Sequence, residues 1–183
     1  MFYGLSHNES YYEDKISLFI ALGPVARVTN EKSSLIHFMS SNFTRNTILD
    51  VTSLLGIYEL FPSNWMTTDV MDFLCDKIPM VCEFSIYLVA DEKIDEDDEM
   101  RSEVYLGHFP SGTSVRTLDH FGQIRAEGEF RKYDYGKKIN IQKYGTDIPP
   151  IIDLNNIKNV PIAMLVGTKD ELADNIDNKW AKN

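Results

Sequence analysis

The chain has 183 residues, a formal net charge of −10 and a sequence pI near 4.8. This length suits one domain with a sizeable core, and 43% hydrophobic residues are typical of a globular protein, not a disordered one. The acidic balance and the lack of a Lys/Arg cluster argue against nucleic acid as a partner. No apolar run approaches the roughly 18 residues of a transmembrane segment. No signal peptide is recognisable in the chain, which opens like the last turns of a helix without a capping residue and so suggests an N-terminus further upstream.

In chain order, the first predicted element is a strand. Ile16–Ala26 is a nearly continuous apolar run, broken by Gly23 and Pro24, and such a run is typical of a parallel strand buried on both faces. Apolar residues at helical spacing then predict helices over Asn46–Phe61 and Asn64–Ile78.

The second half of the chain repeats this order of helix and strand. A helix is predicted over Gly112–Phe130, with Thr113 or Ser114 as its N-cap and a buried stripe of Val115, Leu118, Phe121 and Ile124. Residues 131–156 are predicted to be irregular, and Val160–Gly167 is predicted to be another buried strand. Two parallel-type strands separated by a long helical excursion predict an α/β sheet that carries a cap.

Asp170 is the main candidate for a functional residue. It follows the second predicted strand, and α/β proteins place their sites at the carboxyl ends of parallel strands. The alternative is that Asp170 caps a helix that begins at Glu171. The residues alone leave both interpretations open.

Other candidates for catalysis or metal binding are weaker. Gly4–Asn8 resembles a nucleophile elbow around Ser6, but Asn8 replaces the final glycine and no strand precedes it, so we reject Ser6 as a nucleophile. None of the four histidines pairs with another histidine or a cysteine at metal-ligand spacing. Asp91–Glu99 lacks the ligand pattern of an EF-hand, so no metal site and no cofactor are expected.

Three further features bear on the compartment. Cys75 and Cys82 are either two buried thiols on one helix face or a disulfide, and a disulfide would indicate an oxidising compartment. Asn8 and Asn42 each begin an N-x-[ST] sequon and are candidate glycosylation sites.

Three stretches of the chain resemble one family, the acid lipases, which are gastric and lysosomal triacylglycerol and cholesteryl-ester hydrolases. Phe19–Val28, "FIALGPVARV", is similar to the family's A-L-x-P-V-A strand. His108–Gly136 resembles its H-x-P-A-G-T-S-V-Q…Y-D-W-G signature, with Tyr135 in place of the tryptophan. Asn159–Asp174 is similar to its N-V-P…G-x-x-D-x-L-A-D motif.

The resemblance implies part of an α/β-hydrolase core, with few parallel strands and a large, mainly helical cap and lid. Residues 1–28 would be the end of the helix after the nucleophile and a core strand. Residues 29–154 would form the cap, with the lid at about 58–89, and residues 155–183 would form a core strand and the loop that bears the acid.

By the same resemblance, Asp170 is the acid of a serine–aspartate–histidine triad. The family's nucleophile elbow would fall ahead of Met1, and its histidine would follow Asp170 by roughly thirty residues, beyond Asn183. The chain as given is therefore expected to be the inactive part of a neutral-lipid ester hydrolase of lipid catabolism. The alternative is a non-catalytic lipase-like module that binds lipid or a partner.

The resemblance also implies a lipid-contacting lid and a compartment. The lid residues expected to contact lipid are Phe61, Trp65, Met66, Phe73 and Phe84. Partners would be neutral lipid esters, either triacylglycerol or sterol ester, or a lipid–water interface. The location would be secreted, lysosomal or in the endomembrane lumen. The sequence does not indicate an oligomeric state.

Overall fold

The computed structural model describes residues 1–60, 73, 77 and 112–182. Both cysteines lie outside these ranges. So do the predicted helix at Asn64–Ile78, apart from Phe73 and Lys77, and the predicted lid residues, apart from Phe73. The chain divides into two compact units. The first unit consists of Met1–Lys32 and Gln123–Asn183, and the second unit consists of Ser33–Gly122. None of the described helices is both long and apolar enough to cross a membrane.

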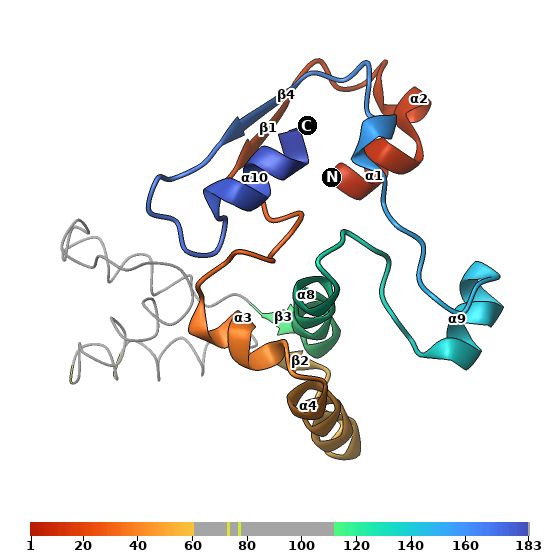
Figure 1. Ribbon diagram of the computed structural model, residues 1–183, viewed down its shortest axis with the longest axis vertical. Helices are drawn as coiled ribbons and strands as arrows, with labels where there is room; N and C mark the ends of the chain where they lie inside the picture. Colours follow the sequence, from red (N-terminus) through yellow and green to blue (C-terminus); the bar gives the residue numbers. More distant parts are fainter. Residues whose placement is uncertain (61–72, 74–76, 78–111, 183) are drawn as a thin grey trace. The chain divides into compact units, whose positions relative to one another are not determined.

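The first unit holds two strands and several short helices, of which α10 lies beside the strands (Figure 1). Its elements are α1 (Phe2–His7), α2 (Glu9–Tyr12), β1 (Phe19–Leu22), α9 (Lys137–Tyr144), the 3₁₀ turn η2 (Leu154–Asn156), β4 (Ile162–Leu165) and α10 (Asn175–Lys182). The second unit holds α3 (Ser34–Met39), α4 (Asn42–Leu54), β2 (Glu59–Leu60) and β3 (Thr113–Ser114). Helix α8 (Val115–Glu127) runs from the second unit into the first.

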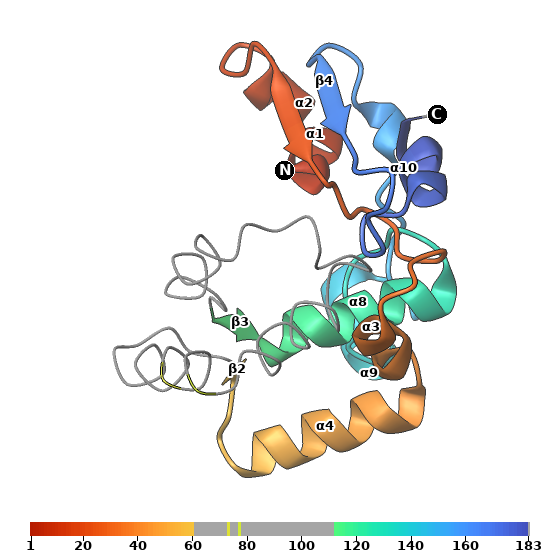
Figure 2. The same ribbon diagram turned by 90° about the vertical axis from the view of Figure 1, so that its left-hand side faces the viewer.

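Strands β1 and β4 form the predicted parallel pair (Figure 2), with Phe19 opposite Ile162 and Leu22 opposite Leu165. Each strand is shorter than its apolar run. Gly23 adopts a φ of +54° and ends β1, while Pro161, which has no N–H, precedes β4 and accepts a hydrogen bond from the Phe19 amide at 2.9 Å.

The prediction that both strands are buried on both faces is wrong for the described structure. Of the four β1 residues only Ala21 is buried, whereas Ile20 and Leu22 are exposed, as is Leu165 in β4. Among the described residues the sheet has two strands, so each strand keeps one unpaired edge and much of its apolar surface stays uncovered.

The core of the first unit lies beside this sheet. Its buried apolar residues come from α1, from β1 and the loop after it, from the end of α8 and from the segments that flank β4: Leu5, Ala21, Ala26, Val28, Ile124, Ile152, Val160 and Ala173. Leu5 and Val28 are fully buried. Segments from both ends of the chain therefore build one core.

Helix α8 confirms the predicted third helix. Ser114 is its cap, because its hydroxyl accepts a hydrogen bond from the Thr117 amide at 3.1 Å. The predicted stripe is buried at Val115 and Ile124 and half-buried at Leu118 and Phe121. The helix ends where Gly128 takes a φ of +75°.

Helix α9 corrects the prediction that residues 131–156 are irregular. It begins after Gly136 and ends at Gly145, which has a left-handed φ of +77°. Hydrophobic periodicity did not predict α9, because the one buried residue of this helix is Asn140, while Ile139 and Ile141 are exposed. The side-chain amide of Asn140 donates to Asp134 Oδ1 at 2.7 Å and to the carbonyl of Asp147 at 3.0 Å, and its oxygen accepts from the Tyr135 amide at 3.0 Å. This helix is thus anchored by a buried amide and not by an apolar stripe.

Glu9 in α2 fixes the start of β4. Its Oε1 accepts hydrogen bonds from the backbone amides of Lys158 at 2.5 Å, Asn159 at 2.6 Å and Val160 at 3.2 Å. The hydrogen bond from the Asn159 amide is the main cause that lowers the pKa of the Glu9 carboxyl below its ordinary value of 4.5.

We expect the Glu9→Gln substitution to destabilise the docking of α2 on the segment before β4 in a pH-dependent way. Because the folded-state pKa is lowered, the ionised carboxylate contributes stability above pH 4.5, and this contribution is lost as the pH falls through the lowered pKa. Hydrogen exchange of the amides of residues 158–160 measures the effect. The variant should exchange faster than the wild type near pH 6, and the difference should shrink in strong acid. A difference that grows with acidification would contradict this assignment.

Candidate functional site at Asp170

The carboxyl ends of β1 and β4 bring together Gly23 and Asp170, which are 147 residues apart in sequence. The Gly23 amide donates to the carbonyl of Leu165 at 2.8 Å, which extends the parallel pairing by one residue. A Cβ on Gly23 would lie 3.4 Å from Asp170 Oδ2. The backbone at the end of β1 therefore lies close to the Asp170 carboxylate, which follows β4.

The Asp170 carboxylate is half-buried and held by its own loop. Oδ1 accepts hydrogen bonds from the amides of Leu172 at 3.0 Å and Ala173 at 2.7 Å. No described residue donates a hydrogen bond to Oδ2. One oxygen is thus used to fix the side chain, and the other remains available to an external donor.

The alternative of Asp170 as the cap of a helix that begins at Glu171 is wrong. Helix α10 begins at Asn175, and Asp174 caps it, with its Oδ1 accepting from the Ile176 amide at 2.6 Å. Asp170 stabilises the turn before this helix. The two aspartates of the motif therefore have separate tasks.

The loop after β1 holds the Asp170 loop through two connections that the sequence did not reveal. The Lys32 amide donates to the carbonyl of Glu171 at 2.9 Å. The buried carboxylate of Asp177 accepts from the backbone and side-chain amides of Asn30, both at 2.8 Å, and lies 3.5 Å from Arg27 Nε. Arg27 in turn stacks over the ring of Trp180 at 5.0 Å.

A second buried acid holds the same loop from α8. Glu31 pairs with Arg125, whose Nη1 lies 2.5 Å from Glu31 Oε1 and also donates to the carbonyls of Val28 and Thr29, both at 3.3 Å. The Glu31 side chain has 0% exposure. No local pattern marks Glu31 or Asp177 as buried, because their partners lie 94 and 147 residues away.

The rejection of Ser6 agrees with its place in the fold. Ser6 lies in α1, and its hydroxyl donates to the carbonyl of Asp153 at 2.5 Å. The His7 ring stacks on Tyr3 at 5.3 Å between centroids, and no described histidine hydrogen bonds to Asp170. The described residues also hold no group of three His, Cys, Asp or Glu side chains that could ligate a metal.

The other predicted site residues are placed only in part. Asn8 and Asn42 are both exposed, so both are accessible to modification. Phe73 is 63% exposed. Phe61, Trp65, Met66, Phe84 and the pair Cys75 and Cys82 lie outside the described residues.

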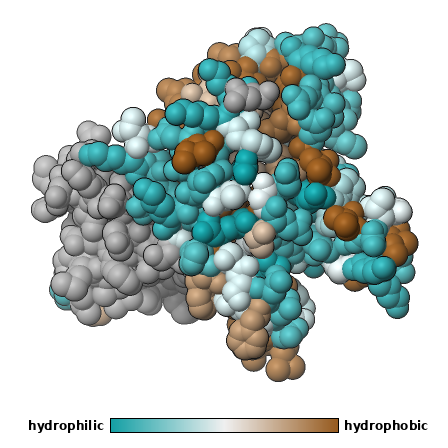
Figure 3. All heavy atoms as spheres, in the orientation of Figure 1, coloured by the Kyte–Doolittle hydropathy of each residue, from teal (hydrophilic) through white to brown (hydrophobic). Residues whose placement is uncertain are grey.

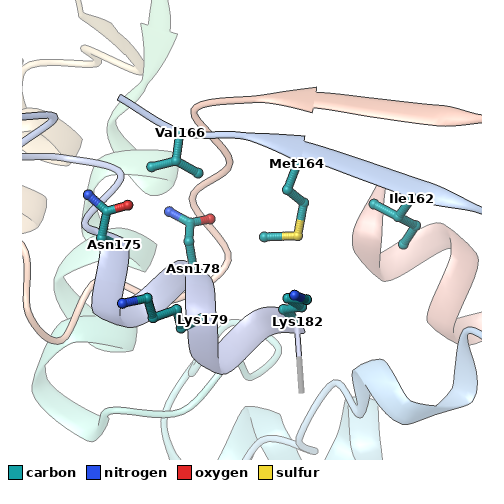
Figure 4. Close-up of a pocket in the computed structure, with 7 residues that line it drawn as sticks. All are labelled: Ile162, Met164, Val166, Asn175, Asn178, Lys179 and Lys182. Carbon is teal, nitrogen blue, oxygen red and sulfur yellow. The ribbon is translucent and has the colours of Figure 1, made fainter. Parts of the chain in front are cut away.

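A groove of about 380 Å³ separates one face of β4 from α10 (Figure 4). Strand side chains of Ile162 and Met164, with Val166 just beyond the strand, point towards the helix. Asn175, Asn178, Lys179 and Lys182 line the opposite side. Asp170 does not line this groove, so the groove is not a binding site around the candidate acid.

Known proteins resemble this chain as its motifs predicted, although no family model matches it. It is 31% identical to Lipase lipl-5 of Caenorhabditis elegans over 180 residues, which are 97% of this chain and 44% of that lipase. It is 32% identical over 183 residues to Lipase lipl-3 of the same organism, with the same coverage. It is 29% identical to the human gastric triacylglycerol lipase over 165 residues, which are 87% of this chain and 39% of the relative.

The chain spans less than half the length of these curated relatives. The relationship implies an α/β-hydrolase fold, which agrees with the parallel pair of β1 and β4. The predicted resemblance to acid lipases is confirmed: over nearly its whole length, this chain is homologous to the nematode lipases and to the gastric triacylglycerol lipases.

Proposed function

We propose that these 183 residues are part of a carboxylic ester hydrolase that acts on neutral lipids in lipid catabolism, with Asp170 as the acid of its catalytic triad. The observation that carries the proposal is the Asp170 carboxylate itself. It follows a parallel strand, two backbone amides hold its Oδ1, and no described residue donates to its Oδ2. The homology to lipases supports the same reaction class.

In this proposal the role of Asp170 is to orient an imidazole. Oδ2 accepts the Nδ1–H of a histidine, which keeps the other ring nitrogen free to take the proton of a serine nucleophile and stabilises the imidazolium that forms. The serine attacks the ester carbonyl, the acyl-enzyme forms as the alcohol leaves, and water then releases the fatty acid. This chemistry needs no cofactor.

We assign neither the nucleophile nor the histidine to the printed 183 residues. Ser6, the one serine in an elbow-like setting, donates its hydroxyl proton to a backbone carbonyl. The proposal therefore includes the absence of hydrolysis by this chain alone. Triacylglycerol and sterol ester are both substrates of the proposed class.

The remaining parts of the proposal concern the cap, the modification sites and the compartment. We place the cap at residues 29–154 and the lid at about 58–89, with Phe61, Trp65, Met66, Phe73 and Phe84 as lipid contacts. The protein would act in the secretory or lysosomal compartment, with sugars on Asn8 and Asn42 and a disulfide between Cys75 and Cys82.

An exchange of segments tests this function. Residues 1–183 would replace the matching segment of Lipase lipl-5, and hydrolysis of tributyrin would be followed in a pH-stat. We expect the chimera to hydrolyse tributyrin and the isolated 183-residue chain to show no turnover above buffer. Circular dichroism of the chimera provides the control for folding. A folded but inactive chimera, or clear turnover by the isolated chain, would contradict the proposal.

A further inference from the structure

Apolar packing of the sheet does little to fix the Asp170 loop. Ile20 and Leu22 of β1 are 55% and 75% exposed, and Leu165 of β4 is 54% exposed. Figure 3 shows apolar residues, in brown, on the surface over these strands at the top of the view. Ala173 is the one buried residue between Val166 and Asp174. Polar contacts therefore contribute much of what holds Asp170 in place.

The loop after β1 meets the Asp170 loop at both of its own ends. At its start, a Cβ on Gly23 would lie 3.4 Å from Asp170 Oδ2. At its end, the Lys32 amide donates a hydrogen bond to the carbonyl of Glu171 at 2.9 Å. Any shift of the loop after β1 is thus transmitted to the residues on either side of the Asp170 carboxylate.

Asp177, in the first turn of α10, holds this loop between its two ends. The side chain is 2% exposed. Its Oδ2 accepts a hydrogen bond from the Asn30 backbone amide at 2.8 Å, and its Oδ1 accepts one from Asn30 Nδ2 at 2.8 Å. Oδ1 also lies 3.5 Å from Arg27 Nε. Both oxygens of a buried carboxylate therefore fasten one loop to the helix that directly follows the Asp170 loop.

From this arrangement we propose that Asp177 is a positioning residue for ester hydrolysis. It holds the loop after β1 against α10 and so keeps Asp170 Oδ2 aligned with the imidazole of the triad. The inference rests on the proposed function, because it assigns to Asp177 an effect that acts through Asp170. A displacement of about 1 Å in a catalytic group can cost about 100-fold in rate, so a positioning residue can have a large effect without touching substrate.

The variant Asp177→Ala in the lipl-5 chimera tests this inference, with p-nitrophenyl butyrate as the substrate. D177A removes both acceptor oxygens and should lower kcat by about 10- to 100-fold. KM should stay within about twofold, because the buried side chain makes no contact with substrate. Asn140→Ala is the matched control, because it removes another buried polar side chain of the same unit, the one that anchors α9. It should lower Tm and leave kcat per folded molecule unchanged.

Asp177→Asn separates position from charge. The oxygen of the new amide can still accept from the Asn30 backbone, and its NH₂ group can donate to the Asn30 side chain once that side chain turns its own amide over. D177N should therefore keep kcat within about threefold of the parent chimera. A loss as large as that of D177A would overturn the inference, because the charge of Asp177 would then matter and not its grip on the loop.

A double variant shows whether Asp177 acts through Asp170. In the Asp170→Asn background the imidazole is already misoriented, so adding D177A should lower the remaining rate by less than about threefold. The same fold loss in both backgrounds would overturn the inference, because Asp177 would then support the fold in general.

Hydrogen exchange of the 183-residue chain measures the loop without hydrolysis. D177A should accelerate exchange of the Leu172 and Ala173 amides, which donate to Asp170 Oδ1, by at least about tenfold. Unchanged exchange would overturn the inference. An inactive but folded parent chimera would contradict the proposed function and, with it, the catalytic role of Asp177. An active parent chimera whose kcat D177A leaves unchanged would overturn this inference alone.

Discussion

Replacing Asp170 with asparagine in the lipl-5 chimera is expected to lower kcat for tributyrin by about 10⁴-fold, the size of the loss when a triad aspartate becomes an amide. Asparagine keeps the shape of the side chain and can still accept from the amides of Leu172 and Ala173 through its oxygen. The atom that replaces Oδ2 is then an NH₂ group, which cannot accept the imidazole N–H and selects the wrong tautomer of the histidine. Initial rates in a pH-stat at saturating substrate measure the effect.

Asp174→Asn is the matched control, because it makes the same chemical change four residues later in the same motif. Asp174 caps α10 through its Oδ1, and asparagine is as good an N-cap as aspartate. Its kcat should stay within about threefold of the parent chimera, because loss of a cap charge affects stability and not the imidazole. Equal losses of kcat in both variants would show that the motif supports the fold and that Asp170 has no separate role in catalysis.

Replacing Arg125 with methionine is expected to release the loop that holds the Asp170 segment. The fully buried Glu31 carboxylate would lose the Arg125 guanidinium, and breaking such a buried pair costs about 3–5 kcal/mol. The carbonyls of Val28 and Thr29 would lose a donor as well. Hydrogen exchange of the amides of residues 26–32 should then accelerate by roughly 100-fold or more.

Two further variants distinguish the buried charge from a general loss of arginine. Lys137→Met breaks the exposed pair of Lys137 with Asp147 and should cost about 0–1 kcal/mol. The double variant R125M/E31L removes both buried charges and should recover most of the lost protection, because apolar replacements of a buried pair are often neutral. If R125M/E31L exchanges as fast as R125M, the arginine contributes through its carbonyl contacts and not through Glu31.

Features that depend on a few neighbouring residues could be predicted from the sequence. The apolar runs predicted two parallel strands, and β1 and β4 pair in this way, although most of their side chains are not buried. Gly23 ends β1, Pro161 directly precedes β4, and Ser114, one of the two predicted caps, caps α8. The motifs at His108–Gly136 and Asn159–Asp174 together predicted the resemblance to lipases, and the homology to known lipases confirms it.

Contacts between residues far apart in sequence could not be predicted from the sequence, and these contacts determine how the site at Asp170 is built. Asp170 and Asp174 have the same side chain in the same motif, and only the position of α10 shows that Asp174 is the helix cap and Asp170 is not. The buried acids Glu31 and Asp177 look like surface charges until Arg125 and Asn30 are found beside them.

The sequence by itself determined the type of fold, the family resemblance and the candidate acid, because periodicity, turn residues and short motifs are local properties of the chain. The tertiary structure alone decided which apolar residues are uncovered, such as Leu54 on α4 and Leu22 on β1, and which charges are buried. Burial depends on what another part of the chain places against a side chain, and no local pattern records that.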